Sequence, residues 1–76
     1  MKELLTYIAQ SLVDHPDEVE VSERESDGEI LLELRVNSDD MGKVIGRQGR
    51  IAKEIRTLVR SYAQRTGAKV TVDIVD

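Results

Sequence analysis

The 76-residue sequence has no cysteine, tryptophan or phenylalanine, and it has one proline, one histidine and two tyrosines. Without cysteine the chain can form no disulfide bond, thiolate metal site or cysteine nucleophile, and such a composition is typical of reducing compartments. Its apolar runs are far shorter than the roughly 18 residues of a membrane span, and its first residues do not resemble a signal peptide. We therefore expect a cytoplasmic protein with no membrane insertion.

The residues that are present indicate a small folded domain. Hydrophobic residues make up 39% of the chain and are mostly Val, Ile and Leu, which is enough for one layer of helices on one sheet. A domain of this size buries only about 60% of its unfolded surface, so a deep catalytic cavity is hard to build in it. We expect one domain over residues 1–76, and a binding module is a better starting hypothesis than an enzyme.

The net charge of −4 hides an uneven distribution. Residues 1–42 contain twelve acidic and three basic side chains, and residues 70–76 add two further acids. Residues 43–69 contain eight basic side chains and one acid, which gives this segment a charge of +7. Such a segment is typical either of a solvated basic helix face or of a surface that contacts a polyanion.

The apolar periodicity predicts an α+β fold with the element order α-β-β-α-α-β. Pro16 cannot continue the first helix, Asp27-Gly28 is a typical hairpin turn, and residues 37–40 offer capping side chains. The expected elements are a helix over 2–14, strands over 18–22 and 30–36, a short helix over 41–45, a long helix over 51–66 and a strand over 70–75. We expect a three-stranded sheet with three helices on one face.

The long helix is expected to be amphipathic, with its core face and its basic face on opposite sides. The predicted core face consists of Ile51, Ile55, Leu58 and Tyr62. The predicted basic face consists of Arg50, Lys53, Arg56 and Arg60. Tyr7, in the apolar stripe of the first helix, is also expected to be a core residue.

A glycine loop separates the short helix from the long one. Gly46 and Gly49 bracket Arg47 and Gln48, and a backbone without Cβ atoms can adopt positive φ and lie close to a phosphodiester chain. An ordinary helix-to-helix turn would also use glycines in this way. The neighbouring basic residues favour the phosphate-binding interpretation.

The residues Val44-Ile45-Gly46-Arg47-Gln48-Gly49 resemble the VIGxxG part of the VIGxxGxxI signature of the KH domain, whose GxxG loop clamps about four nucleotides of single strand, and Ile51 follows one position earlier than the last residue of that signature. The element order resembles the bacterial type II arrangement. Over its whole length the chain is similar to the small bacterial proteins that consist of one KH domain, the KhpA/YlqC type. This resemblance implies RNA binding, dimerisation, and action as a post-transcriptional regulator or RNA chaperone with a Jag-like KH partner in cell-envelope and division control.

The resemblance also implies which residues contact single-stranded RNA. Gly46 and Gly49 would form the clamp, with Arg47 and Gln48 at its tip, so Gly46→Asp or the pair Arg47→Asp and Gln48→Asp is expected to remove RNA binding from an intact fold. The implied RNA-binding residues are Lys43, Val44, Ile45, Gly46, Arg47, Gln48, Gly49, Arg50, Lys53 and Arg35.

These residues are expected to act in different ways. Lys43, Arg50 and Lys53 would meet phosphates, and Arg35 would be the basic residue on the sheet side of the groove. Core packing is the main role expected of the apolar residues beside the loop. These are Val44, Ile45 and Ile51.

Other classes of function find less support. The glycine loop lacks the GK[ST] of a Walker loop, and His15, with Asp14 and Asp17 nearby, is better explained as a solvated histidine at a helix end than as a metal or acid-base site. We expect no catalytic step, metal or cofactor. Two alternatives remain, a DNA-binding helix-turn-helix module and an adaptor whose basic helix docks a protein.

Overall fold

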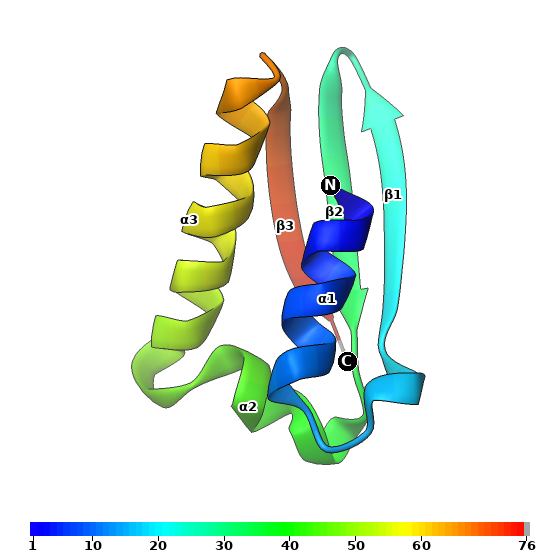
Figure 1. Ribbon diagram of the computed structural model, residues 1–76, viewed down its shortest axis with the longest axis vertical. Helices are drawn as coiled ribbons and strands as arrows, with labels where there is room; N and C mark the ends of the chain where they lie inside the picture. The colour runs from blue at the N-terminus through cyan, green and yellow to red at the C-terminus, as the bar shows by residue number, and fades with distance from the viewer. Residues whose placement is uncertain (76) are drawn as a thin grey trace.

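A computed structural model describes residues 1–75 and contains three α-helices, three strands and three short 3-10 turns (Figure 1). The helices are α1 (Lys2–Leu12), α2 (Met41–Ile45) and α3 (Arg50–Arg65). The strands are β1 (Glu20–Ser26), β2 (Glu29–Arg35) and β3 (Lys69–Val75). The 3-10 turns are η1 (Pro16–Glu18), η2 (Ser38–Asp40) and η3 (Arg47–Gly49).

The strands form one sheet with β2 in the centre, in the order β1-β2-β3. β1 and β2 are antiparallel and are joined by a two-residue turn in which Asp27 and Gly28 both have positive φ, which fits the type I′ turn expected from Asp-Gly. β2 and β3 are parallel, so the chain has to cross the sheet between them. α2, the glycine loop and α3 make up this crossover.

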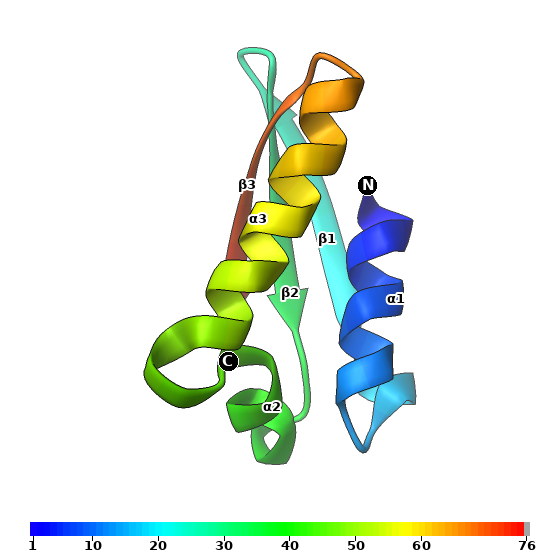
Figure 2. The same cartoon turned by 60° about the vertical axis from the view of Figure 1, so that its left-hand side comes forward.

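All three helices lie on one face of the sheet, with α3 over β3 and α1 over β1 and β2 (Figure 2). The largest fully buried apolar side chains come from both layers: Leu5, Leu32, Leu34, Val44 and Val59. Side chains alternate along each strand, so the other face carries mainly polar residues, including the ion pair between Arg24 and Glu33. The predicted fold class, an α+β fold of type II KH topology with three helices on one face, is confirmed.

The long helix ends at a Schellman motif. The N–H of Ala68 donates to the carbonyl of Ala63, the N–H of Gly67 donates to the carbonyl of Gln64, and Gly67 has a φ of 77°. This geometry ends the helix at Arg65, next to the expected end at residue 66. The chain leaves the motif directly into β3.

The prediction of which apolar residues form the core was partly wrong. Leu58 and Tyr62 are 53% and 47% exposed, and Tyr7 is 71% exposed. The buried positions of α3 are Ala52, Ile55, Val59 and Ala63. Small alanines let the helix pack closely on the sheet, so the buried face is centred on them and not on the largest apolar residues. α3 therefore carries an additional, exposed apolar stripe.

Two element boundaries also differ from expectation. α1 ends at Leu12 rather than near residue 14, and β1 extends to Ser26 although its second half is rich in Glu and Ser. Residues 20–26 pair with β2 along their whole length, so the ladder outweighs the weak strand propensity of these side chains.

None of the helices in the described residues is long and apolar enough to cross a membrane.

Candidate nucleic-acid interface

The glycine loop begins where α2 ends, at a backbone conformation that only glycine adopts easily. Gly46 has φ 74° and ψ 178°, and its N–H donates to the carbonyl of Gly42 to close the last turn of α2. A Cβ at Gly46 would lie 2.6 Å from Cγ1 of Ile51. Gly49 has a left-handed φ of 74°, but a Cβ there would meet open space. Gly46 is therefore required by both conformation and packing, and Gly49 by conformation alone.

The tip of the loop is exposed and holds a strained residue. Gln48 has φ 56° and ψ 25°, a left-handed conformation that an L-residue other than glycine, asparagine or aspartate seldom adopts. Strain of this kind persists only where the surrounding structure imposes it, and it is often found at functional sites. Arg47 and Gln48 both point their side chains into solvent.

The three apolar residues around the loop differ in burial. Val44 is fully buried, so its side chain cannot contact a ligand, and Ile51 packs partly against the core. Ile45 is 36% exposed and is not among the residues packed against the core, so the expectation that it is mainly a core residue was wrong. α2 is only five residues long, and Val44 is its one buried residue. Ile45 is an apolar surface beside the glycine loop.

The basic residues of α3 lie along the side of the helix nearest the edge strand β3. Nε of Arg56 donates to the carbonyl oxygen of Val72 on β3 at 3.1 Å, and Arg60 lines a shallow hollow together with Lys69 and Thr71. Lys53 is exposed one turn nearer the loop. Basic residues thus follow one another from the loop along this side of α3, namely Arg47, Arg50, Lys53, Arg56 and Arg60.

Arg35 does not belong to this series of basic residues. It is exposed at the end of β2, where its neighbours Leu34 and Val36 are buried against the helices. Because side chains alternate between the two faces of a strand, Arg35 lies on the face opposite the helices. The structure therefore brings together the nine other predicted residues on α2, the loop and α3, and it separates Arg35 from them.

Lys43 is the member of the predicted set that is held by acids. Its Nζ lies 2.8 Å from Oδ2 of Asp14 and 3.6 Å from Oδ1 of Asp40. The carboxylate of Asp40 is buried and also accepts hydrogen bonds from the backbone N–H groups of Asp14 and His15, at 3.2 and 3.0 Å. The ring Nδ1 of His15 lies 2.9 Å from Oδ2 of Asp40.

The sequence did not reveal the importance of Asp40. Residues 37–40 suggested capping side chains, and Asn37 does accept a hydrogen bond from the N–H of Asp39, but Asp40 is the buried charge that joins the segment after α1 to the start of α2. His15, which the sequence predicted to be solvated, is the side chain that pairs with Asp40. Among the described residues no group of His, Cys, Asp and Glu suited to holding a metal ion occurs.

The pKa values in this cluster reflect its ion pairs. The hydrogen bond to Asp40 raises the pKa of His15 above its ordinary value, against a smaller opposing effect of burial. Burial alone would raise the pKa of Asp40, but the hydrogen bonds from the ring of His15 and from two backbone N–H groups together lower it. The hydrogen bond to Asp14 raises the pKa of Lys43. Asp40 and Lys43 are both charged at neutral pH.

The fold and the loop together define a type II KH domain. The helix pair is broken by a GxxG turn, it crosses between two parallel strands, and a hairpin precedes it. A family model for the KH domain of KhpA and KhpB matches residues 2–74. The chain belongs to the KhpA/KhpB family of KH domains, which confirms the resemblance seen in the sequence.

Curated relatives cover the whole chain and carry the name RNA-binding protein KhpA. The protein from Clostridium acetobutylicum is 56% identical over 75 residues, which is 99% of this chain and 100% of the relative. Those from Halalkalibacterium halodurans and Listeria monocytogenes are 50% and 43% identical over 76 residues, covering both chains completely. Membership of this non-enzymatic family confirms the expectation that the chain is not an enzyme.

A solved structure shares the fold. Aquifex aeolicus Era, crystallised with GDP and AlF4⁻, matches with a TM-score of 0.66 and 21% sequence identity. The match covers 96% of this chain and 28% of the Era chain. At this identity the match shows a common fold and carries no argument about activity.

The different constraints on the two loop glycines can be measured. We expect Gly46→Ala to lower the free energy of unfolding by about 3 kcal/mol or more, because it combines an unfavourable backbone conformation with a clash against Ile51. Gly49→Ala should cost only about 1–2 kcal/mol, the penalty of a left-handed alanine. Urea denaturation of both variants tests this, and equal costs would contradict it. Gly46→Asp combines the same backbone conformation with the same clash against Ile51. We therefore do not expect it to leave the fold intact, although the sequence predicted that it would.

The His15–Asp40 pair predicts how stability depends on pH. Because the pKa of His15 is raised, its pair contributes stability that is fully present below the ordinary value of 6.5 and is lost as the pH rises through the raised value. The contribution of Asp40, whose pKa is lowered, is present above its ordinary value of 3.8 and is lost as the pH falls through the lowered one. Thermal melting should therefore show a larger deficit of His15→Gln at about pH 5.5 than at about pH 8. A deficit that is constant over this range would contradict the pairing.

Proposed function

We propose that residues 1–76 act as a single KH domain that binds single-stranded RNA through the glycine loop and the adjoining basic side of α3. The observation that carries this proposal is the loop itself, in which Gly46 is barred from holding any side chain and the tip is held exposed in a strained conformation. The names of its relatives as RNA-binding proteins support the choice of ligand.

The path of the strand follows from the positions of the positive charges. Arg47 and Arg50 lie at the loop and the first residue of α3, and Lys53 follows one turn later. A backbone clamped at the loop would continue past these side chains toward Arg56, whose guanidinium is oriented by the carbonyl of Val72. Ile45 offers an apolar surface on which a base can pack. It would take the part that aromatic side chains have in other RNA-binding modules, because both tyrosines, Tyr7 and Tyr62, lie elsewhere in the described residues.

The architecture argues against a helix-turn-helix module. In that motif the second helix enters the major groove of DNA, and a wing, where present, follows it. Here the hairpin precedes both helices and β3 closes the sheet beside α3, with Arg56 attached to its edge. The adaptor alternative, in which the basic helix docks a protein, would use the same basic side of α3 as the proposed RNA path.

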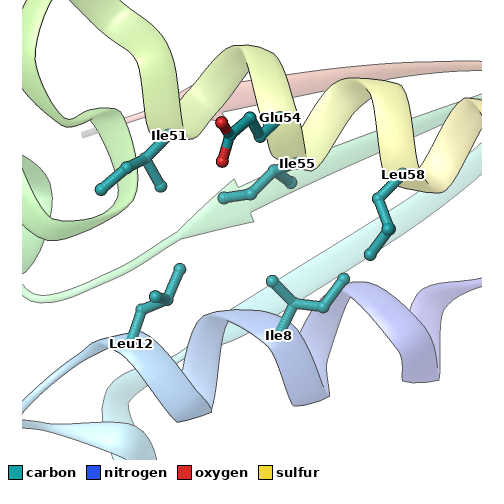
Figure 3. Close-up of a pocket in the computed structure, with 6 residues that line it drawn as sticks. All are labelled: Ile8, Leu12, Ile51, Glu54, Ile55 and Leu58. Carbon is teal, nitrogen blue, oxygen red and sulfur yellow. The ribbon is translucent and has the colours of Figure 1, made fainter.

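A second copy of the chain is the partner that we propose for the exposed apolar stripe of α3. A groove of about 280 Å³ runs between α1 and α3, and side chains from both helices point into it (Figure 3). Its lining residues are Ile8, Leu12, Ile51, Glu54, Ile55 and Leu58. It continues past Leu58 toward Tyr62 and Arg65. Exposed Leu58 and Tyr62 beside this groove are the kind of apolar surface that a partner can cover.

Spacing and charge favour pairing of α3 with its own copy. Residues 51, 58, 62 and 65 are separated by seven, four and three positions, which fits the heptad spacing of helices that pack side by side, while Ile55 between them is buried in the core. Glu54 lies near the start of this stripe and Arg65 at its end. A two-fold axis perpendicular to α3 makes the α3 helices of the two copies antiparallel. It brings Glu54 of each copy toward Arg65 of the other.

The wider role implied by the resemblance stays a prediction. It comprises post-transcriptional regulation or RNA chaperoning, together with a Jag-like KH partner in cell-envelope and division control. A Jag-like partner would compete with the second copy if it used the same groove.

The RNA proposal is tested by reversing charge at the loop tip. The pair Arg47→Asp and Gln48→Asp should keep the fold, because both side chains are exposed and aspartate tolerates the backbone conformation of Gln48 better than most residues. Its affinity for single-stranded RNA should fall by at least about tenfold, and its salt dependence should weaken by about 0.7 in slope for each phosphate that the variant no longer neutralises. Fluorescence anisotropy at several salt concentrations measures both.

The matched control is Ser22→Glu with Arg24→Glu, which makes the same change in net charge on the opposite face of the sheet. It should reduce affinity much less. Equal losses of affinity in the two double variants would mean that the overall charge, and not the loop, governs binding.

The self-association proposal is tested at the centre of the stripe. Leu58→Glu should shift the protein toward monomer by at least about tenfold in dissociation constant, because it places a charge in the apolar contact. Thr57→Glu, on the same helix but outside the groove, is the control. Sedimentation that is the same for both variants, or a wild-type protein that is monomeric at high concentration, would contradict a dimer through α3. If the wild-type protein is monomeric and associates only after a Jag-like protein is added, the groove is assigned to that partner.

A further inference from the structure

Lys43 differs from the other basic residues proposed to contact RNA because it is already ion-paired. Its Nζ is 2.8 Å from Asp14 and its side chain is 44% exposed. Arg47, Arg50 and Lys53 make no ion pair within residues 1–75 that the structure describes. A phosphate that reaches Lys43 must therefore displace a carboxylate first, whereas the other three side chains are open to it.

The two acids that hold Lys43 differ in mobility. Asp40 is buried and tied to two backbone N–H groups and the ring of His15, so its carboxylate cannot leave. The side chain of Asp14 is 71% exposed, and its backbone N–H is anchored on Asp40 at 3.2 Å. The fold thus keeps Asp14 beside Lys43 while leaving its carboxylate able to rotate into solvent.

Carboxylate and phosphate oxygens accept the same hydrogen bonds from an ammonium group. An exposed ion pair is weak, and it can be exchanged for a phosphate contact without disturbing the fold. The buried Asp40, 3.6 Å from Nζ, would keep the lysine side chain near its position during this exchange.

We propose that Asp14 is an intramolecular competitor of RNA phosphate for Lys43, so that it limits the contribution of this lysine to RNA affinity. The inference rests on the proposed RNA-binding function. It gives Asp14, which lies outside the glycine loop and outside the proposed RNA path, a direct effect on binding through its 2.8 Å contact with Lys43.

The test compares two substitutions that remove the same charge. Asp14→Asn removes the competitor, and Asp17→Asn removes an exposed acid of η1 that makes no ion pair in the described part of the chain. The probe is a labelled single-stranded RNA of about eight random nucleotides, twice the span of a KH clamp. We expect Asp14→Asn to raise affinity about two- to fivefold more than Asp17→Asn does, the range that corresponds to an exposed ion pair.

The same pair of substitutions is then made in a Lys43→Gln background. There the competitor has nothing to compete for, so Asp14→Asn and Asp17→Asn should change affinity equally. Thermal melts check that each variant is folded. An advantage of Asp14→Asn that persists without Lys43, or equal effects of the two substitutions in the wild-type background, would overturn the proposal.

Failure of this proposal can be told apart from failure of the proposed function. If wild-type protein binds the RNA and the pair Arg47→Asp and Gln48→Asp abolishes binding, the loop function stands, and equal effects of Asp14→Asn and Asp17→Asn refute the competitor alone. If wild-type protein does not bind the RNA, both proposals fall.

Discussion

The parallel pairing of β2 with β3 is the constraint on which the rest of the structure depends. Parallel neighbours cannot be joined by a tight turn, so the chain between Arg35 and Lys69 has to cross one face of the sheet. In this domain the crossover is broken at Gly46–Gly49 into a short and a long helix. The break creates an exposed loop at one end of the sheet, held on both sides by helices that pack on the core. The proposed RNA clamp is thus a consequence of how the crossover is divided.

A five-residue helix such as α2 is too short to hold its place by its own hydrogen bonds, and two other contacts fix it. Val44 anchors one side in the core, and buried Asp40 attaches its start to the segment that follows α1. The loop inherits its position from these anchors. Burial of Asp40 is tolerated because its carboxylate accepts several hydrogen bonds and faces two cationic or protonatable groups, His15 and Lys43.

The sequence predicted most of the fold because its signals were local. Asp27-Gly28 and Thr66-Gly67 require particular turns, and alternating strands and the GxxG pattern are visible in short windows. What it could not predict depended on contacts between distant residues. Burial of Asp40 needs the amides of residues 14 and 15, and the core face of α3 depends on alanines that fit against the sheet, which a wheel weighted toward large apolar residues misplaces. Arg35 was misplaced although its position between Leu34 and Val36 in an alternating strand already puts it on the face opposite the helices.

The three sides of α3 show how one helix of 16 residues serves several purposes. The alanine-rich side attaches it to the sheet, the basic side follows β3, and the stripe through Leu58 and Tyr62 faces the groove beside α1. Because basic and apolar stripes flank the buried side from opposite directions, a second copy bound at the groove would leave the basic side open. The acidity of the remaining chain would then confine the proposed RNA to that side, since carboxylates on β1 and β2 would repel it elsewhere. A net charge of −4 is therefore compatible with RNA binding when its positive part is gathered on one side of one helix and its loop.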